Sequence, residues 1–342
     1  MATRNLRPNK DNPIPLYSAG GSPLLTGAPS GPTGGGRSLG QDAWQRLLRN
    51  RLAFIGLAFI VLMVFLTILG PPVLGKLTGF DYAYQPTDNQ AALRSIAPFR
   101  AFDGSFNLQH PMGTDDIGRD MLQRVLIGGR ISLMVGVIAT LVSLLIGVTY
   151  GAIAGYAGGR LDNLLMRVVD VLFALPYMLI VIVLLAFFGG NNLAGGSAMG
   201  QLILLFVALG AVSWLNMARI VRGQVLSLKN QDFVLAARAT GVSPARIIFR
   251  HLVPNVLGPV IVYATLTVPA VMLQEAFLSF LGLGVQAPLT SWGGLAADGI
   301  KTIGIYPWQL IFPGVTMALT LFALNFLGDG LRDAFDPQTR KT

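Results

Sequence analysis

Long apolar runs bounded by ionised residues divide this 342-residue chain into candidate membrane spans. A helix that crosses a bilayer needs about 20 consecutive apolar residues. The first run lies between Arg51 and Lys76 and predicts a span at 52–75. The second lies between Arg130 and Arg160, and its repeated small residues suit close packing between membrane helices. Each of these runs predicts one span.

The stretch between Asp170 and Arg219 predicts two spans. It carries no charge and is too long for one helix, and the segment GGNNLAGGSAMG interrupts it with turn-forming residues. The third and fourth spans are therefore expected near 168–188 and 199–218.

Two more spans are predicted in the C-terminal part of the chain. The fifth starts after Pro254 and reaches about residue 281, and the sixth covers 307–327. Between them, GLGVQAPLTSWGGLAADG is too rich in Gly, Pro and polar residues to face lipid, so it is expected to form a loop or re-entrant hairpin that rests on protein. The pattern predicts an all-α membrane protein with six transmembrane helices.

The composition supports this interpretation and sets the topology. The chain is 53% hydrophobic and only 12% charged, too little charge for the surface of a soluble domain of this length. Six spans place both termini on one side, and most of the 25 Lys and Arg residues fall on that side. Because basic residues favour cytoplasmic segments, both termini are predicted to be cytoplasmic. The net charge of +9 then indicates contact with membrane lipid at the inner leaflet and no nucleic-acid partner.

The spans imply five regions along the chain. Residues 1–40 are rich in Gly, Pro and Ser and are predicted to form a disordered cytoplasmic tail. The other regions are an amphipathic segment with the first span at 41–75, an extracytoplasmic segment at 76–129, a five-helix core at 130–330 with a cytoplasmic loop at 219–254, and a cytoplasmic tail at 331–342.

Few catalytic chemistries fit the sequence. There is no cysteine, and His110 and His251 are the two histidines, so thiolate metal sites and cysteine nucleophiles are excluded. The segment GPTGGGRS (31–38) imitates a phosphate-binding loop, but Arg37 replaces the lysine and no strand precedes it. Energy for any pumping would therefore come from ions or from a partner. Ion-driven carriers place acidic or histidine groups at mid-membrane, and these spans hold little of that kind.

The loop at 219–254 carries start and stop signals for two short helices. Asp232 is expected to cap a first helix, Gly241 to end it in a left-handed turn, and Ser243 and Pro244 to start a second helix at its N-cap and N1 positions.

The second predicted helix is amphipathic. Its apolar residues Ile247, Ile248 and Leu252 share one face, and Arg246 and Arg250 lie on another. These arginines either sit among anionic lipid headgroups or belong to a docking element for a cytosolic protein, and their spacing fits both.

At this point the loop becomes recognisable. The stretch AARATGVSPARIIFRHLVP resembles the EAA loop of ABC-importer permeases, with Ala236, Ala237, Gly241 and Pro254 at the matching positions. Leu235 stands where that family usually has glutamate. The resemblance implies that the segment from Asp232 to His251 holds the helix that couples the permease to its ATPases. The residues expected in this coupling loop are Asp232, Leu235, Ala236, Ala237, Arg238, Gly241, Ser243, Pro244, Arg246, Arg250, His251 and Pro254.

The resemblance extends over nearly the whole chain after residue 38. GTDDIGRDMLQRVLIGGRISLMVGV, VSWLNMARIVRGQVLSLK, EAFLSFLGLGVQAPLTSWGGL and LNFLGDGLRDAFDP, in this order, are similar to the C-type subunit of oligopeptide permeases. This similarity implies the type I ABC-importer permease fold in the cytoplasmic, or inner, membrane and alternating access as the mechanism. Dipeptide, glutathione and nickel permeases are the neighbouring branches of the family.

The resemblance also implies a heteromeric complex. A homologous B-type permease would pair with this chain, two cytosolic ABC ATPases would bind ATP and Mg and dock beneath, and an extracytoplasmic peptide-binding protein would deliver the substrate. This chain would then be a non-catalytic translocation subunit that binds no cofactor. An ion-coupled carrier and a membrane scaffold or receptor are the alternatives from other functional classes.

Two groups of charges near the spans have structural and functional interpretations. Glu275 lies toward the outer end of the fifth span, where it either faces the translocation pathway or anchors the hairpin that follows. Arg167 and Asp170 are one helical turn apart and are expected to form an ion pair.

Overall fold

The structure is a computed structural model that describes residues 39–78, 94–101, 104–189 and 197–335. The predicted tail at 1–40 falls almost entirely outside these residues, and so does the end of the C-terminal tail, from residue 336. The description below concerns the unit Gly40–Thr342.

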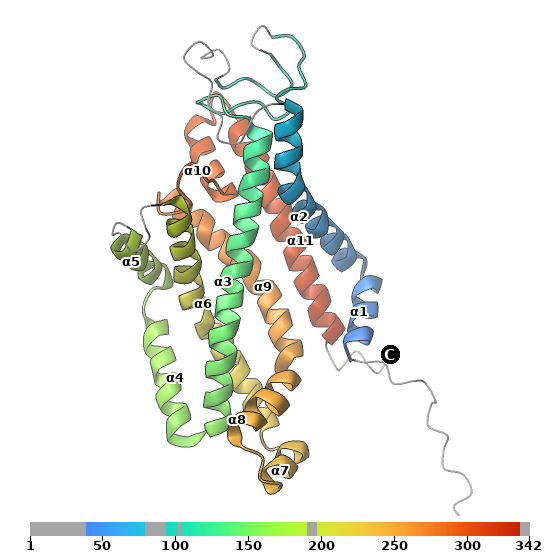
Figure 1. Ribbon diagram of the computed structural model, residues 1–342, viewed down its shortest axis with the longest axis vertical. Helices are drawn as coiled ribbons and strands as arrows, with labels where there is room; N and C mark the ends of the chain where they lie inside the picture. Colours follow the sequence, from blue (N-terminus) through green and yellow to red (C-terminus); the bar gives the residue numbers. More distant parts are fainter. Residues whose placement is uncertain (1–38, 79–93, 102–103, 190–196, 336–342) are drawn as a thin grey trace, which may run out of the picture. The chain divides into compact units, whose positions relative to one another are not determined.

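Helices make up this unit, and the described residues contain no strand (Figure 1). The α-helices are α1 (Leu39–Arg49), α2 (Arg51–Thr78), α3 (Met121–Ala157), α4 (Gly159–Ala174), α5 (Tyr177–Gly189), α6 (Ala198–Leu228), α7 (Asp232–Ala239), α8 (Pro244–Arg246), α9 (Val253–Phe280), α10 (Trp292–Thr302) and α11 (Trp308–Phe335). A π-helix, Ile247–Leu252, joins α8 to α9.

Five helices among the described residues are long and apolar enough to cross a membrane. They are α2, α3, α6, the continuous helix Pro244–Phe280 and α11. They correspond to the first, second, fourth, fifth and sixth predicted spans, which are confirmed. The helix α3 begins at Met121, where the side chain of Asp120 accepts a hydrogen bond from the Gln123 amide, so the last residues of the predicted extracytoplasmic segment at 76–129 belong to this helix.

The third predicted span is a bent pair of helices, α4 and α5, which together are long and apolar enough for one broken span or a re-entrant loop. The helices α4 and α5 meet at an angle of 82°. Leu175 between them is extended, with φ −81° and ψ 138°, because the ring of Pro176 disfavours the helical conformation in the residue before it. At 1.5 Å per residue α5 is about 20 Å long, so it cannot cross the roughly 30 Å hydrocarbon core by itself.

The fifth predicted span belongs to a longer helix that begins before Pro254. The second short helix of the loop does not end before Pro254 but continues into α9 through the π-helix. The backbone amide of Val253 donates to the carbonyl of Ile248, which widens the helix directly before Pro254. A wider turn relieves the clash that a proline ring makes with an α-helical carbonyl four residues earlier.

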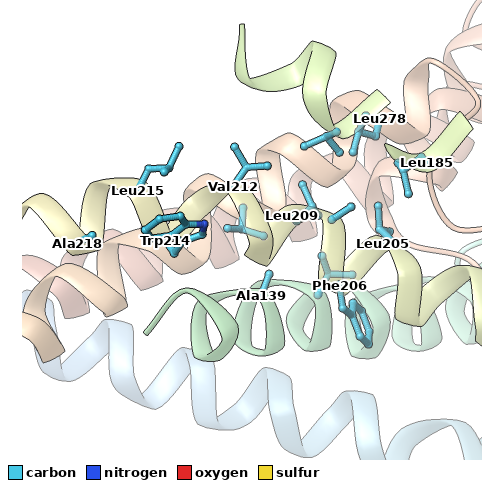
Figure 2. Packing of buried hydrophobic residues seen from close by; sticks show 14 of the residues in the cluster. Ala139, Leu185, Leu205, Phe206, Leu209, Val212, Trp214, Leu215, Ala218 and Leu278 are labelled. Atoms are coloured by element: carbon cyan, nitrogen blue, oxygen red, sulfur yellow. The ribbon is translucent and has the colours of Figure 1, made fainter. Parts of the chain in front are cut away.

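The helices α3 and α6 approach each other closely along a row of glycines on α3. A Cβ atom at Gly151 would lie 2.4 Å from the carbonyl oxygen of Ala218, and one at Gly147 would lie 2.6 Å from the Cβ of Met217. Figure 2 shows the apolar side chains of α6 that lie between α3 and the neighbouring helices. The predicted close packing through small residues in the second span is confirmed.

The outer connection between α2 and α3 is held by buried polar contacts where it is described. The carboxylate of Asp115 accepts hydrogen bonds from Arg119 Nε at 2.7 Å and from Arg124 Nη1 at 2.6 Å. The carbonyl of Thr114 accepts from the side chains of Trp308 and Gln309 in α11, both at 3.2 Å. These bonds fix the start of α3 to the start of α11.

The glycine row predicts a position-specific effect on stability. The substitution Gly151→Ala should lower the free energy of unfolding by about 1–3 kcal/mol, because the new methyl group meets the backbone of α6. Unfolding of the purified protein in detergent measures this change.

Gly223→Ala in α6 is the matched control. A Cβ at Gly223 meets nothing within 4 Å, so this change should raise stability by up to about 1 kcal/mol through helix propensity. Equal effects of the two substitutions would contradict the packing role of Gly151.

Candidate coupling loop and membrane cavity

The helix α7 lies at one end of the helix bundle, directly after the end of the long helix α6 (Figure 1). The 31 residues of α6 are about 46 Å long, against about 30 Å for the hydrocarbon core. Arg219 and Arg222 occupy the last turns of α6, and charges are costly inside the bilayer. These turns of α6 therefore lie in water or at the interface, and α7 follows them.

Ion pairs tie α4 to this projecting part of α6. Arg222 donates two hydrogen bonds to the carboxylate of Asp162, at 2.6 and 2.8 Å. Arg219 donates to Asp170 at 2.7 Å and lies 4.1 Å from the ring of Phe173. The predicted pair between Arg167 and Asp170 is wrong, because the tertiary partner Arg219 takes the Asp170 carboxylate.

The start of α7 differs from the prediction by one residue. Gln231 is the N-cap and Asp232 is the first helical residue, and no side chain caps this end. A carboxylate in the first turn still interacts favourably with the positive end of the helix dipole. Asp232 therefore supports α7 through its charge and not through a capping hydrogen bond.

The end of α7 is a complete Schellman motif. The amide of Val242 donates to the carbonyl of Ala237 at 3.1 Å, and the amide of Gly241 donates to that of Arg238 at 3.0 Å. Gly241 has a φ of +75°, which confirms the predicted left-handed turn.

The next helix begins where the sequence indicates. Ser243 is its N-cap, with extended backbone angles, and Pro244 is its first residue, although the Ser243 side chain makes no capping hydrogen bond. The predicted amphipathic pattern is also confirmed: Ile247, Ile248 and Leu252 are buried, whereas Arg246 and Arg250 are exposed.

We call residues 229–252 the α7 loop. One face of α7 packs into a buried cluster shared by three spans. Val234 is fully buried and Ala237 nearly so, in a cluster with Val225 of α6, Ala152 of α3 and Leu252 of the π-helix. A displacement of α7 would therefore act on α3, α6 and the fifth span together.

Two polar contacts fix the α7 loop to the end of α3. The guanidinium of Arg238 lies over the ring of Tyr156, 5.0 Å from its centre, in a cation–π contact. The ammonium group of Lys229 donates to the carbonyl of Gly155 at 2.9 Å. Arg238 thus has a structural partner within the chain.

The opposite face of the α7 loop is exposed and largely apolar at its centre. Phe233 is 40% exposed and Leu235 is 47% exposed, and Ala236 lies beside them. Phe249 is also exposed, whereas His251 is half-buried. Pro254 is exposed, next to the π-helix. The helix α7 thus presents an apolar surface, around Phe233 and Leu235, at the end of the bundle that extends beyond the membrane.

A cavity of about 550 Å³ lies between the α4–α5 break, α6 and α9. Its polar lining groups are Tyr177, Ser213, Asn216, Tyr263, Thr267 and Gln274. None of the described residues that line it is Asp, Glu, Lys, Arg or His. The cavity is thus uncharged but has several hydrogen-bonding side chains.

One hydrogen bond connects the helix break to α9 across this cavity. The hydroxyl of Tyr177 donates to Oε1 of Gln274 at 2.5 Å. Ser213 donates to the carbonyl of Leu209 in its own helix at 2.7 Å and lies 3.3 Å from the Tyr177 oxygen. The sequence analysis missed Tyr177, Ser213 and Gln274; a proline directly before Tyr177 and a glutamine beside Glu275 in an apolar span were the available signals.

Glu275 lies outside this cavity and anchors the hairpin between α9 and α11. It is 1% exposed, and its Oε1 accepts hydrogen bonds from the hydroxyls of Ser279 at 2.6 Å and Ser291 at 2.7 Å. Ser291 is the N-cap of α10 and also accepts from the amide of Gly294. The geometry favours the anchoring role over the pathway role for Glu275.

The hairpin rests on protein, as expected. The indole of Trp292 is fully buried and donates a hydrogen bond to the carbonyl of Val125 at 2.8 Å. The backbone amide of Trp292 donates a hydrogen bond to Ser132 Oγ at 3.1 Å. Leu295 is buried in the same cluster. The contacts join α10 to α3.

A bundle of membrane helices with a projecting helical loop and an uncharged cavity between its helices is typical of a multi-pass membrane transport protein. Residues 147–341 match the family described as binding-protein-dependent transport system inner membrane component, and residues 38–98 match the N-terminal transmembrane domain of oligopeptide transport permease C. The chain belongs to the binding-protein-dependent transport family and is a multi-pass inner membrane protein.

Relatives with these matches share most of their length with this chain. The oligopeptide transport system permease protein OppC of Escherichia coli K12 is 50% identical over 305 residues, 89% of this chain and 93% of the relative. OppC of Haemophilus influenzae is 47% identical over 89% of this chain and 90% of its own. The dipeptide transport system permease protein DppC of Bacillus subtilis is 44% identical, over 88% of this chain and 86% of the relative.

A solved structure shows the same fold. A chain of the MetNI methionine ABC transporter, in an inward-facing crystal form, aligns with a TM-score of 0.50 at 19% identity, covering 63% of this chain and 97% of the solved one. The likeness supports the type I ABC-importer permease fold.

The hairpin anchor predicts a graded response at Glu275. Glu275→Leu leaves the Ser279 and Ser291 hydroxyls without their acceptor and should cost about 1–3 kcal/mol of stability. Glu275→Gln keeps an acceptor oxygen and should retain most of the stability, as unfolding in detergent would show. Loss of uptake in a fully assembled Glu275→Gln complex would contradict the anchoring role and support a place in the pathway.

Proposed function

We propose that this chain is the translocation subunit of a heteromeric ATP-driven importer of peptides, most specifically oligopeptides. The observation that carries the proposal is the α7 loop: a capped helix, packed against three spans, with an exposed apolar face beyond the membrane. The substrate class rests on the oligopeptide and dipeptide permeases that share most of this chain.

The position of α7 supports a protein partner over lipid. The last turns of α6, which carry Arg219 and Arg222, lie between α7 and the hydrocarbon core. A helix that served only to bind headgroups would lie at the interface, with its apolar face in the acyl region. The exposed face of α7 is therefore the docking surface for an ATPase in the cytoplasm, which is also the side that the basic residues indicate.

The chemistry of the docking surface is mainly apolar. Phe233 and Leu235 supply its centre, and the exposed Arg246 and Arg250 supply positive charge nearby. Because Leu235 has no carboxylate, contact at this position is by burial of apolar area and not by an ion pair. The partner surface is accordingly expected to offer an apolar pocket with acidic residues at its rim.

The packing of α7 provides a route for coupling. Interiors are densely packed, so a push on α7 is transmitted and not absorbed. Val234 and Ala237 would pass it to α6, and the cluster around Leu252 would pass it to the fifth span, which also lines the cavity. ATP-driven closure of the partners would thereby change access to the cavity.

The remaining partners follow from this assembly. A homologous B-type permease would complete the pathway, and a peptide-binding protein would deliver substrate at the outer end of the bundle, near α10. Two ABC ATPases would hold ATP and Mg, and this chain would hold neither and catalyse no hydrolysis.

Reconstitution tests the proposed function. Proteoliposomes with the permease pair, both ATPases, the binding protein and ATP should accumulate an oligopeptide, and those without ATPases should not. Collapse of the ion gradients should leave uptake unchanged. Uptake by this chain without ATPases, abolished when the gradients are collapsed, would instead establish an ion-coupled carrier.

The turn after α7 gives a test of the coupling loop itself. Gly241→Val forces a β-branched residue to a φ of +75°, at a cost of about 1–2 kcal/mol, and should reduce both ATPase binding and peptide-stimulated ATP hydrolysis. Gly241→Asn is the control, because asparagine tolerates this conformation. Normal binding and hydrolysis in Gly241→Val would show that this turn has no part in coupling.

A further inference from the structure

We propose that the uncharged cavity at the α4–α5 break binds the main chain of a peptide in transit and does not discriminate between side-chain charges. This inference rests on the proposed function and adds a site and its selectivity. The volume of the cavity, about 550 Å³, lies in the range of about 300–1,000 Å³ typical of ligand sites.

The depth of the cavity makes its polar groups informative. It lies between Arg219, at the projecting end of α6, and the Glu275 anchor, at the other end of α9. Polar side chains at this depth are costly next to lipid and normally face protein or a water-filled path. Asn216 is nevertheless exposed on this chain, so the side of the cavity that it lines is expected to open to a path or partner and not to hydrocarbon.

The Tyr177–Gln274 bond determines what the cavity offers. Because the Tyr177 hydroxyl occupies Oε1 of Gln274, the Gln274 amide group is held with its two N–H donors available, and no hydrogen bond to this amide is found among the described residues. The side chain of Asn216 adds both a donor and an acceptor, and none of the described residues forms a hydrogen bond to it. Peptide groups carry one donor and one acceptor per residue, so these amides match the main chain of any sequence.

The charged neighbours of the cavity are already engaged elsewhere. Arg219 pairs with Asp170, and Glu275 accepts from Ser279 and Ser291. No described lining residue carries a formal charge that would attract one peptide and repel another. The cavity therefore favours neither lysine-rich nor glutamate-rich peptides, and selection by charge must occur at another step.

Placing a carboxylate in the cavity tests this directly. The complete ATPase-containing complex is reconstituted with Gln274→Glu, and uptake is measured for an alanine peptide and for versions with one lysine or one glutamate. The ratio of lysine-peptide uptake to glutamate-peptide uptake should be about tenfold higher in the Gln274→Glu complex than in the wild-type complex, because a buried charge acts across a low dielectric. Asn216→Asp places the charge on another helix and should change the ratio in the same direction.

Gln224→Glu is the matched control. Gln224 lies on α6 outside the cavity lining, so the lysine-to-glutamate uptake ratio of the Gln224→Glu complex should equal that of the wild type. A wild-type ratio in an assembled Gln274→Glu or Asn216→Asp complex would overturn the proposal. Failure of both variants to assemble would overturn it as well, because these side chains would then serve packing and not a ligand. Failure of the wild-type complex to transport any of the peptides would instead refute the proposed function.

Discussion

The close approach of α3 and α6 is the constraint on which the rest of this structure depends. Gly147 and Gly151 let the two backbones approach to distances at which any Cβ would collide. Membrane helices gain little from burying apolar area against each other, so close backbone packing takes over much of the stabilisation. Once α3 and α6 are joined, their ends hold the outer hairpin on one side and the α7 loop on the other.

The same pair explains how distant features are connected. At one end of α3, Trp292 and Arg124 connect it to α10 and to the outer segment. At the other end, Tyr156 receives Arg238 from the α7 loop. The fifth span starts in the cluster beneath α7, passes the cavity at Gln274 and ends at the Glu275 anchor. The α7 loop, the cavity and the hairpin are thus parts of one packed unit.

Features set by local chemistry could be predicted from the sequence. Apolar length located five spans, and Gly241 and Pro244 marked the turn and helix start of the α7 loop, because left-handed backbone and the N1 position have strong residue preferences. The broken third span was missed because the effect of Pro176 was outweighed by the apolar run around it. Asp170 was assigned the wrong partner because a neighbour in sequence says nothing of Arg219 on another helix.

The cavity could not be predicted for the same physical reason. Tyr177 and Gln274 are 97 residues apart, and nothing local to either one signals the hydrogen bond between them. The α7 loop, by contrast, is nearly contiguous in sequence, so its caps and amphipathic face were visible. Its burial against three spans was not, and this packing is the basis of the mechanical role proposed for the loop.

The central claim is that the exposed face of α7 contacts an ATPase in the assembled complex. The chain contains no cysteine, so Leu235→Cys provides a single attachment point for a photoreactive crosslinker. The account predicts that irradiation of the intact, reconstituted complex joins this chain to an ATPase subunit. Crosslinking to lipid alone, with the ATPases bound and active, would contradict it.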